Sequence, residues 1–410
     1  MQQELIPHLF RTESRKITAV LCKLFGLGNV SIAEDIVGET FLTALETWPY
    51  KGIPENPAAW LYTVAKNKAK NLAVRNQLFN QKIRPDIESG TPIVPAFEID
   101  LSEKNINDSQ LQMLFAICHP SIPAEAQIGL ALRILCGFGI DEIANAFLTN
   151  KETINKRLFR AKEKLRTEKV EIAFPEDAEI GNRMQAVLTT LYLLFNEGYY
   201  SESRDTILRN DLCLEAMRLT HMLIENPTTD LPNVNALMAL MCFHASRFEA
   251  RKNAGGEIVL YQDQDESLWN RELITKGAFY LNKASTGQQI SKYHLEAGIA
   301  YWHTIKEDTE EKWESILHLF NQLLSIAYSP VTALNRTYAL SKVRGNRVAI
   351  IAAEKLNLSN NLFYYTLLGE LYKTIDPQEA QNNLLKALHL SRTKTDKQLI
   401  RKKIEELDTL

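Results

Sequence analysis

Apolar residues recur along most of the chain at the three- and four-residue spacing of a helix face. Hardly any segment alternates between apolar and polar residues with the two-residue period of a β-strand. Turn-forming residues separate the helical patterns at intervals that suit helices of about 10 to 15 residues. The pattern therefore predicts an all-α protein.

A long interruption of the helical pattern lies between the first and second helical regions. Proline and glycine are crowded there, at Pro85, Gly90, Pro92 and Pro95. Because proline blocks helix interiors and favours extended chain, we predict a flexible linker at residues 81–104. The helical regions on either side of this linker would be free to move apart.

The linker divides the chain into predicted domains. Residues 1–80 form a first small helical domain, and residues 105–170 form a second. The sequence EIAFPEDAEIG then leads into a larger helical region at 175–410.

This larger region contains an internal repeat. Leu334, Tyr338, Ile350 and Ala353 recur 34 residues later, in the same order, as Leu368, Tyr372, Leu384 and Ala387. This period is typical of tetratricopeptide (TPR) units, in which paired helices stack on the next pair. We therefore predict TPR-like helical hairpins; the alternative is an irregular helical bundle with one chance periodicity.

The net charge of −3 conceals two strongly basic segments. Residues 65–85 hold six Lys or Arg and no Asp or Glu, and residues 151–166 hold seven Lys or Arg against two Glu. Local charge of this kind favours an anionic partner such as a nucleic acid. The alternative is that each segment is an ordinary solvated helix face.

The second basic segment follows a short helical pattern across a tight break. Apolar residues mark one stripe at Ile140, Ile143, Ala144 and Phe147, and a second at Ile154, Leu158, Ala161 and Leu165. Thr149 stands three residues before Glu152, which is the spacing of a helix capping box. A helix, a tight turn and a basic helix together predict a helix-turn-helix that enters a DNA major groove. A helical hairpin with a polar face is the alternative.

The first domain contains an acidic helical pattern at residues 33–48. Its apolar positions include Ile36, Phe41, Leu42 and Leu45, and its exposed acidic positions are Glu34, Asp35, Glu39 and Glu46. Because its exposed face is negative, this helix suits a basic protein surface better than DNA.

The next segment places aromatic residues before a run of cations. Aromatic side chains beside Lys and Arg can stack on unpaired bases while the cations contact the backbone of the nucleic acid. The candidate residues are Trp60, Lys66, Lys68, Lys70, Asn71 and Arg75, with Tyr62 beside them. The alternative is that Trp60 and Tyr62 belong to the core.

Taken in order, these segments resemble a bacterial sigma factor of the extracytoplasmic-function (ECF) group in the sigma-70 family. The sequence AEDIVGETFLTALETW resembles the region-2 helix that docks on RNA polymerase. The sequence NPAAWLYTVAKNKAKNLAVR is similar to the helix that melts and captures the −10 promoter element. The sequence IDEIANAFLTNKETINKRLFRAKEKLR resembles the region-4 helix-turn-helix that reads the −35 element.

The resemblance covers about residues 1–170 and implies roles for individual residues. Core RNA polymerase would bind Asp35, Glu39, Phe41, Leu42 and Leu45. The −10 element would contact the candidates at Trp60 to Arg75 named above. The −35 element would contact Thr153, Asn155, Lys156, Arg157, Arg160 and Lys164. A flexible linker would let two weak DNA-binding modules act together, because tethering raises their effective concentration.

The remaining chain resembles an ECF subgroup that carries a TPR-like C-terminal extension. The similarity lies in CHPSIPAEAQIGLALRILCGF, LFNEGYYSES, DLCLEAMRL and IVLYQDQDESLWNRELI. It implies that the extension regulates the sigma domains in cis, and it leaves room for a peptide or protein partner of the repeats.

Polar residues gather in one part of the extension, at His244, Arg247, Arg251, Asp263, Asp265 and Trp269. We expect them to form a buried polar network or salt bridges that fix two helical hairpins. A second interpretation is that they bind a ligand or partner, and a third is that they carry out acid–base or metal chemistry.

Nothing else in the sequence indicates catalysis. No glycine-rich phosphate loop, nucleophile motif or metal-ligand spacing accompanies the polar cluster, so we expect no cofactor, no metal and no enzymatic activity. The five cysteines show no paired spacing, and no apolar run reaches the roughly 18 residues that span a bilayer. We expect a cytoplasmic protein without a membrane segment.

Two other functions remain open at this point. The chain could be a one-component transcriptional regulator, whose C-terminal region binds a ligand or protein while the helix-turn-helix binds an operator. It could also be a helical-repeat scaffold to which the N-terminal part contributes little.

Overall fold

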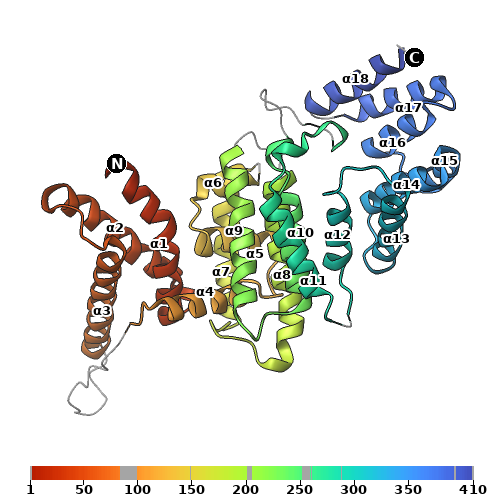
Figure 1. The fold of residues 1–410 in the computed structure, drawn as a ribbon. Helices are drawn as coiled ribbons and strands as arrows, with labels where there is room; N and C mark the ends of the chain where they lie inside the picture. The colour runs from red at the N-terminus through yellow and green to blue at the C-terminus, as the bar shows by residue number, and fades with distance from the viewer. Residues whose placement is uncertain are drawn as a thin grey trace. The chain divides into compact units, whose positions relative to one another are not determined.

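The computed structural model describes residues 2–83, 99–147, 149–200, 206–251, 259, 261–287, 289–391 and 394–408. Every regular element within these residues is helical, so the predicted all-α fold is confirmed (Figure 1). Most of the predicted linker, residues 84–98, lies outside the described residues, and so does Leu148 in the turn of the helix-turn-helix. The chain folds into two compact units, Met1–Thr229 and Asp230–Leu410.

The first unit begins with three helices, α1 (Gln2–Phe25), α2 (Val30–Lys51) and α3 (Pro57–Ile83). Their shared core includes Ile17, Ile36 and Leu61, all almost fully buried. Gly52 ends α2 with a φ of 84°, a backbone conformation that favours glycine. Asn56 then accepts a hydrogen bond from the amide of Ala59 at 3.0 Å, which satisfies an otherwise free donor at the start of α3.

Four further helices follow: α4 (Glu103–Ile117), α5 (Ala124–Leu130), α6 (Ile140–Ala146) and α7 (Lys151–Thr167). Helix α5 continues into a π-helical turn at Ala131–Leu135. The predicted apolar stripe of α7 is buried at all four positions. A Cβ atom at Gly129 would lie 3.0 Å from Leu158, so glycine in α5 allows α7 to pack closely.

The start of α7 differs from the sequence prediction. Thr149 does not cap this helix, because its amide donates to the carbonyl of Ala144 at 2.9 Å and closes the preceding helix. Asn150 is the capping residue, and its side chain accepts from the amide of Thr153 at 2.8 Å. The capping box of Thr149 and Glu152 is therefore wrong by one residue.

Two long helices of the predicted third domain belong to the first unit. They are α8 (Asp177–Tyr200) and α9 (Thr206–Glu225), and they pack against α4, α5 and α6 (Figure 1). Arg183 donates to the carbonyl of Phe115 at 2.6 Å, and the buried Thr190 hydroxyl donates to Gln127 at 2.7 Å. The extension therefore begins as part of the unit that holds the helix-turn-helix.

The second unit is a succession of helices in which each packs on its neighbours in sequence. They are α10 (Pro232–Ala245), α11 (Arg271–Ala284), α12 (Lys292–Trp302), α13 (Glu310–Ile326), α14 (Pro330–Arg344), α15 (Asn346–Glu354), α16 (Leu362–Tyr372), α17 (Pro377–Leu390) and α18 (Lys394–Asp408). Short 3₁₀ turns at Glu249–Arg251, Tyr261–Asp263 and Glu266–Leu268 lie between α10 and α11.

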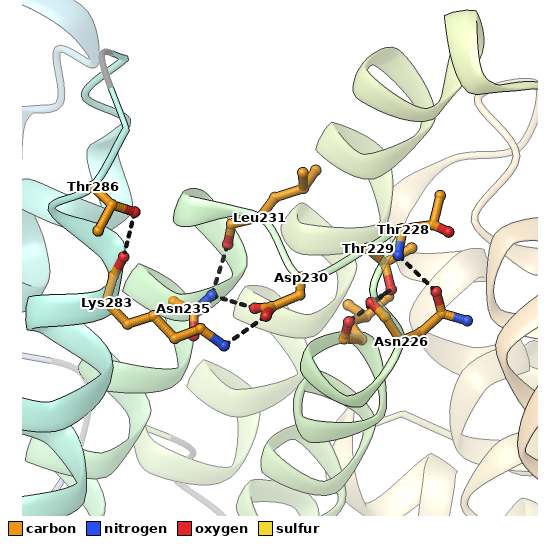
Figure 2. A network of polar contacts seen from close by, with 9 residues as sticks. Asn226, Thr228, Thr229, Asp230, Leu231, Asn235, Lys283 and Thr286 are labelled. Carbon is orange, nitrogen blue, oxygen red and sulfur yellow. Dashed lines mark hydrogen bonds and ion pairs between the residues drawn. The ribbon is translucent and has the colours of Figure 1, made fainter.

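The start of α10 is joined to the end of α11 by an ion pair. The Asp230 carboxylate accepts from the Lys283 ammonium at 2.6 Å and from the side-chain amide of Asn235 at 2.7 Å (Figure 2). Asn235 also donates to the carbonyl of Leu231 at 3.0 Å, so one amide group serves both the turn and the ion pair. This network orients the first helical hairpin of the unit.

The positions of the sequence repeat have matching environments in the second unit. Leu334, Ile350 and Ala353 are buried, and so are their counterparts Leu368, Leu384 and Ala387. Tyr338 and Tyr372 are both half-buried. The equal burial of the two sets supports the interpretation of two related helical hairpins.

Candidate polymerase and nucleic-acid interface

An apolar groove of about 840 Å³ lies in the first unit. Its walls come from α1, α2 and the segment between the π-helical turn and α6, and they include Phe10, Phe41, Leu42, Leu45, Trp48 and Gly137. Leu42 and Leu45 are 53% and 52% exposed, so two large apolar side chains of α2 face solvent at this groove.

The predicted polymerase-binding residues lie on this groove or beside it. Phe41 is buried and packs edge-on against Phe10, with ring centroids 5.0 Å apart, so it supports the groove from below. Asp35 and Glu39 are exposed on the same helix. Leu42 and Leu45 are the apolar members of the set whose side chains are exposed.

Glu34 was expected to be exposed with the other acidic residues of α2, and this expectation is wrong. Its carboxylate is partly buried between two cations of the helix-turn-helix segment. Arg133 donates to it at 2.8 Å, and the Lys162 ammonium of α7 lies 3.7 Å away. Glu34 therefore links α2 to the helix-turn-helix.

The candidate DNA-binding residues of α3 have different degrees of exposure. Lys70, Asn71 and Arg75 are exposed, and Lys66 is half-buried. Lys68 forms an ion pair with Glu39 at 3.2 Å.

The aromatic residues at the start of α3 pack into the first unit. Trp60 is half-buried, with its ring centroid 5.4 Å from that of Trp48 in α2. Tyr62 donates a hydrogen bond to Glu13 of α1, and burial together with this carboxylate raises the pKa of its hydroxyl. Both rings therefore take part in helix packing.

The outer face of α7 is open at its first turns. Thr153, Asn155, Lys156 and Arg160 are exposed, whereas the Arg157 guanidinium lies over the Phe147 ring at 5.4 Å. Lys164 is exposed and pairs with Glu168 at 2.8 Å. This arrangement leaves the N-terminal part of the basic helix accessible, as a recognition helix requires.

Sequence reasoning missed one residue of this face. Phe159 is 66% exposed beside Lys156 and Arg160. An apolar ring among cations on an exposed helix face is suited to contact with a thymine methyl group or with a protein surface. Its departure from the apolar spacing of the buried stripe could have identified it.

Helix α9 makes a polar clamp onto α1 and the π-helical turn, which the sequence did not predict. Glu215 forms ion pairs with Arg15 of α1 and, at 2.8 Å, with Arg218 of its own helix. Arg218 also donates to the carbonyl of Leu135 at 2.9 Å. We call Arg15, Glu215 and Arg218 the α9 clamp.

The predicted polar cluster of the second unit is only partly assembled. Arg247 and Trp269 are buried, and His244 and Arg251 are half-buried. Asp263 and Asp265 are exposed, and neither pairs with Arg247. The Asp265 carboxylate instead accepts from the amide of Ser267 at 2.9 Å, which lowers its pKa. The expected salt bridges to these aspartates are therefore wrong.

The buried part of this cluster surrounds Tyr261, which was not among the predicted cluster residues. The Arg247 guanidinium lies 5.5 Å from the Tyr261 ring centroid, and the rings of Trp269 and His303 lie 6.3 and 5.2 Å away. Lys312, which is fully buried, donates to the Tyr261 hydroxyl at 3.1 Å. We call these five residues the Tyr261 cluster.

The described residues give little support for metal binding, a membrane-spanning helix or a reactive thiol. No group of His, Cys, Asp or Glu among them could hold a metal ion, and none of their helices is long and apolar enough to cross a membrane. All five cysteines are buried, and burial raises the pKa of the Cys22 and Cys118 thiols to about 12, which disfavours the reactive thiolate.

Comparison with known proteins assigns two segments of the chain. Residues 9–78, within α1 to α3, match sigma-70 region 2, and residues 183–285 match a family of unknown function, DUF6596. The region 2 match indicates a sigma factor-like role in transcription initiation, since this domain binds core RNA polymerase and promoter DNA in the sigma-70 family.

An uncharacterized protein of Rhizobium meliloti (strain 1021) is 32% identical over 391 residues, which cover 92% of this chain and 90% of the relative. The chain belongs to the same family as this relative. Its residues 9–78 are similar to sigma-70 region 2. No solved structure matches the chain.

Proposed function

We propose that the protein is an ECF-type sigma factor that binds core RNA polymerase and directs initiation at its own promoters. The observation that carries this proposal is the region 2 match over helices whose apolar groove carries two exposed leucines. Leu42 and Leu45 would anchor the polymerase, and the exposed Asp35 and Glu39 would complement basic residues around that contact.

Promoter DNA would be held by two separate faces. The cations of α3 would contact the −10 element, and the open first turns of α7 would contact the −35 element. The assignment is supported by the exposure of Lys70, Arg75, Lys156 and Arg160. A cationic side chain must be accessible from solvent to contact a phosphate group.

The compact first unit cannot hold both elements at once. Elements centred near −10 and −35 are about 25 base pairs apart, which corresponds to about 85 Å of duplex. In the unit, α3 packs on α2, and Glu34 of α2 lies 3.7 Å from Lys162 of α7. The two faces would therefore have to separate before the promoter is bound.

We infer that the C-terminal extension controls this separation in cis. Helix α9 is joined to α1 by Arg15 and Glu215, and Arg218 joins it to the π-helical turn that precedes α6 and α7. A contact of one helix with both sigma-like parts stabilises the closed unit. The chain between α3 and α4, residues 84–102, is long enough to span about 65 Å when extended, so opening does not require unfolding of either part.

The repeats of the second unit would form a TPR-like surface for a peptide or protein partner. The matching burial of Leu334 and Leu368 supports related hairpins. Gly369 also allows Leu384 to pack tightly, since a Cβ atom there would lie 2.7 Å from the leucine side chain.

The test is transcription in vitro from genomic fragments with core polymerase and the full chain. Replacing Leu42 and Leu45 together by Asp should weaken polymerase binding at least about 30-fold, because each leucine would lose about 1 kcal/mol of apolar burial. The matched control is Leu385→Asp, at a leucine of α17 that is 50% exposed. This control should bind polymerase as the unaltered chain does.

Failure of the full chain to direct initiation from any fragment would refute the proposal, provided that loss of the α9 clamp does not restore activity. A one-component regulator would instead bind a duplex operator tightly and would not be retained by core polymerase. Measuring retention of the full chain by core enzyme separates these two functions.

A further inference from the structure

Among the residues that the structure describes, the second unit contains a buried cation without an anionic partner. Arg247 is 8% exposed, and no carboxylate of the described residues lies within 4.0 Å of its guanidinium group. Its Nε atom is buried and makes no hydrogen bond. Burial of an unpaired guanidinium is costly, and an anion bound beside it would lower that cost.

The side chains around Arg247 have further unused hydrogen-bonding groups. The indole Nε1 of Trp269, the Nδ1 of His303 and the Oε1 of Gln264 are all buried without a hydrogen-bond partner. Trp269 and Gln264 are themselves 3% and 4% exposed. Trp269 and His303 lie beside the Tyr261 ring, and Gln264 directly follows the 3₁₀ turn that begins at Tyr261.

The nearby carboxylates are occupied by other groups. Asp308 accepts from Lys342 at 3.0 Å and from the Trp313 indole. Glu266 lies 3.5 Å from Arg271, on the exposed side of the turn. None of them neutralises Arg247.

A second buried cation adds to the positive potential. Lys312 is fully buried, and its ammonium donates to Tyr261, to the carbonyl of Ile305 at 2.6 Å and to that of Glu307 at 3.3 Å. These three bonds use its three donors and leave its charge uncompensated by a direct ion pair. Burial of the ring is the main cause that lowers the pKa of His303, and the charges of Arg247 and Lys312 lower it further.

We propose that the Tyr261 cluster binds a small oxyanion, the carboxylate or phosphate group of a ligand. Arg247 supplies the charge and an Nε–H donor, and Trp269 and His303 supply neutral N–H donors. Gln264 offers an acceptor for a hydroxyl or amine on the same ligand. An oxyanion satisfies the buried donors and the buried charge together, which an ordered water molecule cannot do.

This proposal does not depend on the sigma function, and its test involves no polymerase. Thermal unfolding of the full chain is measured in inorganic phosphate, in succinate and in chloride at equal ionic strength. At a hundredfold excess over Kd, the binding anion should raise the midpoint of the second unit by about 5 to 10 °C. The anion that acts identifies the class: phosphate indicates a phosphorylated ligand, and succinate a carboxylate ligand.

The variant Arg247→Met distinguishes a binding site from a structural arginine. Its midpoint in chloride should equal or exceed that of the unaltered chain, since it removes a buried unpaired charge, and the response to the anion should disappear. The matched control, Arg271→Met, removes an exposed arginine and should keep the full response. A large loss of stability in chloride for Arg247→Met would instead show a structural role and overturn the proposal.

A second measurement tests the site in the unaltered chain, without any substitution of Arg247. Selective ¹⁵N labelling of tryptophan gives one indole signal per residue, and Trp269→Phe assigns the signal of interest. The Trp269 signal should shift with phosphate or succinate, whereas those of Trp48 and Trp60 should not. If neither anion shifts the Trp269 signal, the proposed site is refuted. This result would mean that only water hydrates the buried donors.

Discussion

Neutralising Glu215 should open the first compact unit. Its carboxylate is shared by Arg15 and Arg218, and the side chains of Glu215 and Arg15 are only 16% and 13% exposed. The Nε of Arg15 is already buried without a partner. The substitution Glu215→Gln keeps the size of the side chain and removes the charge that holds both arginines.

The expected effect lies between that of an exposed ion pair and that of a buried one. Exposed pairs contribute about 0.2 to 1 kcal/mol, whereas breaking a buried pair costs about 3 to 5 kcal/mol. For this partly buried pair we expect about 2 to 3 kcal/mol. Because 1.4 kcal/mol corresponds to a factor of ten, the ratio of open to closed molecules should rise about 30- to 100-fold.

Distance measurement between two dyes detects this opening. The five native cysteines are buried, so introduced cysteines at the exposed Asn67 of α3 and Glu152 of α7 would react selectively. Energy transfer between them should fall in Glu215→Gln, and initiation by core polymerase should rise in parallel. Glu225→Gln is the control, since this glutamate lies on the same helix and contacts only the exposed His221, at 3.6 Å.

Unchanged energy transfer in Glu215→Gln would refute the clamp, even if transcription changed. A fall in energy transfer without a rise in initiation would leave the clamp standing and refute its role as an inhibitory contact. Equal responses of Glu215→Gln and Glu225→Gln would show a general effect of charge on α9.

Two other predictions concern the second unit. Burial beside Arg247 and Lys312 lowers the pKa of His303 to about 3, below the roughly 6.5 of an unfolded histidine. The unfolded chain therefore binds the extra proton first, and the free energy of unfolding should fall by up to about 1.4 kcal/mol per pH unit as pH drops from about 6.5 towards 3. In His303→Gln, the free energy of unfolding measured with urea should depend less on pH across this window. Gly369→Ala should destabilise the unit by about 1 to 3 kcal/mol because its Cβ would lie 2.7 Å from Leu384, whereas Gly181→Ala in α8, which meets nothing within 4 Å, should not destabilise the chain when both are compared by calorimetry.

The local features of the fold follow from local sequence patterns. The stripe of Ile154, Leu158, Ala161 and Leu165 is buried as its spacing predicts, because a helix presents every third or fourth residue to the same neighbour. The repeat positions around Leu334 and Leu368 are buried for the same reason. The cap of α7 shows where this reasoning ends, since Thr149 and Asn150 are both good capping residues and only the preceding turn decides between them.

Contacts between residues far apart in the sequence could not be predicted from such patterns. Glu34 and Arg133 are 99 residues apart, and Arg15 and Glu215 are 200 residues apart. Neither pair leaves a periodic trace, and an acidic residue on an amphipathic helix looks exposed until its partner is known. The prediction of salt bridges from the aspartates of the polar cluster was wrong for the opposite reason. Asp263 and Asp265 are close to Arg247 in sequence, but they do not pair with it.

Residues of both proposed sites lie within one family segment. The DUF6596 match at 183–285 contains Glu215 and Arg218 of the α9 clamp, and it also contains Arg247 and Trp269 of the Tyr261 cluster. A segment that served only as a spacer would need neither a shared carboxylate nor a buried unpaired guanidinium, and both are costly to keep without a function.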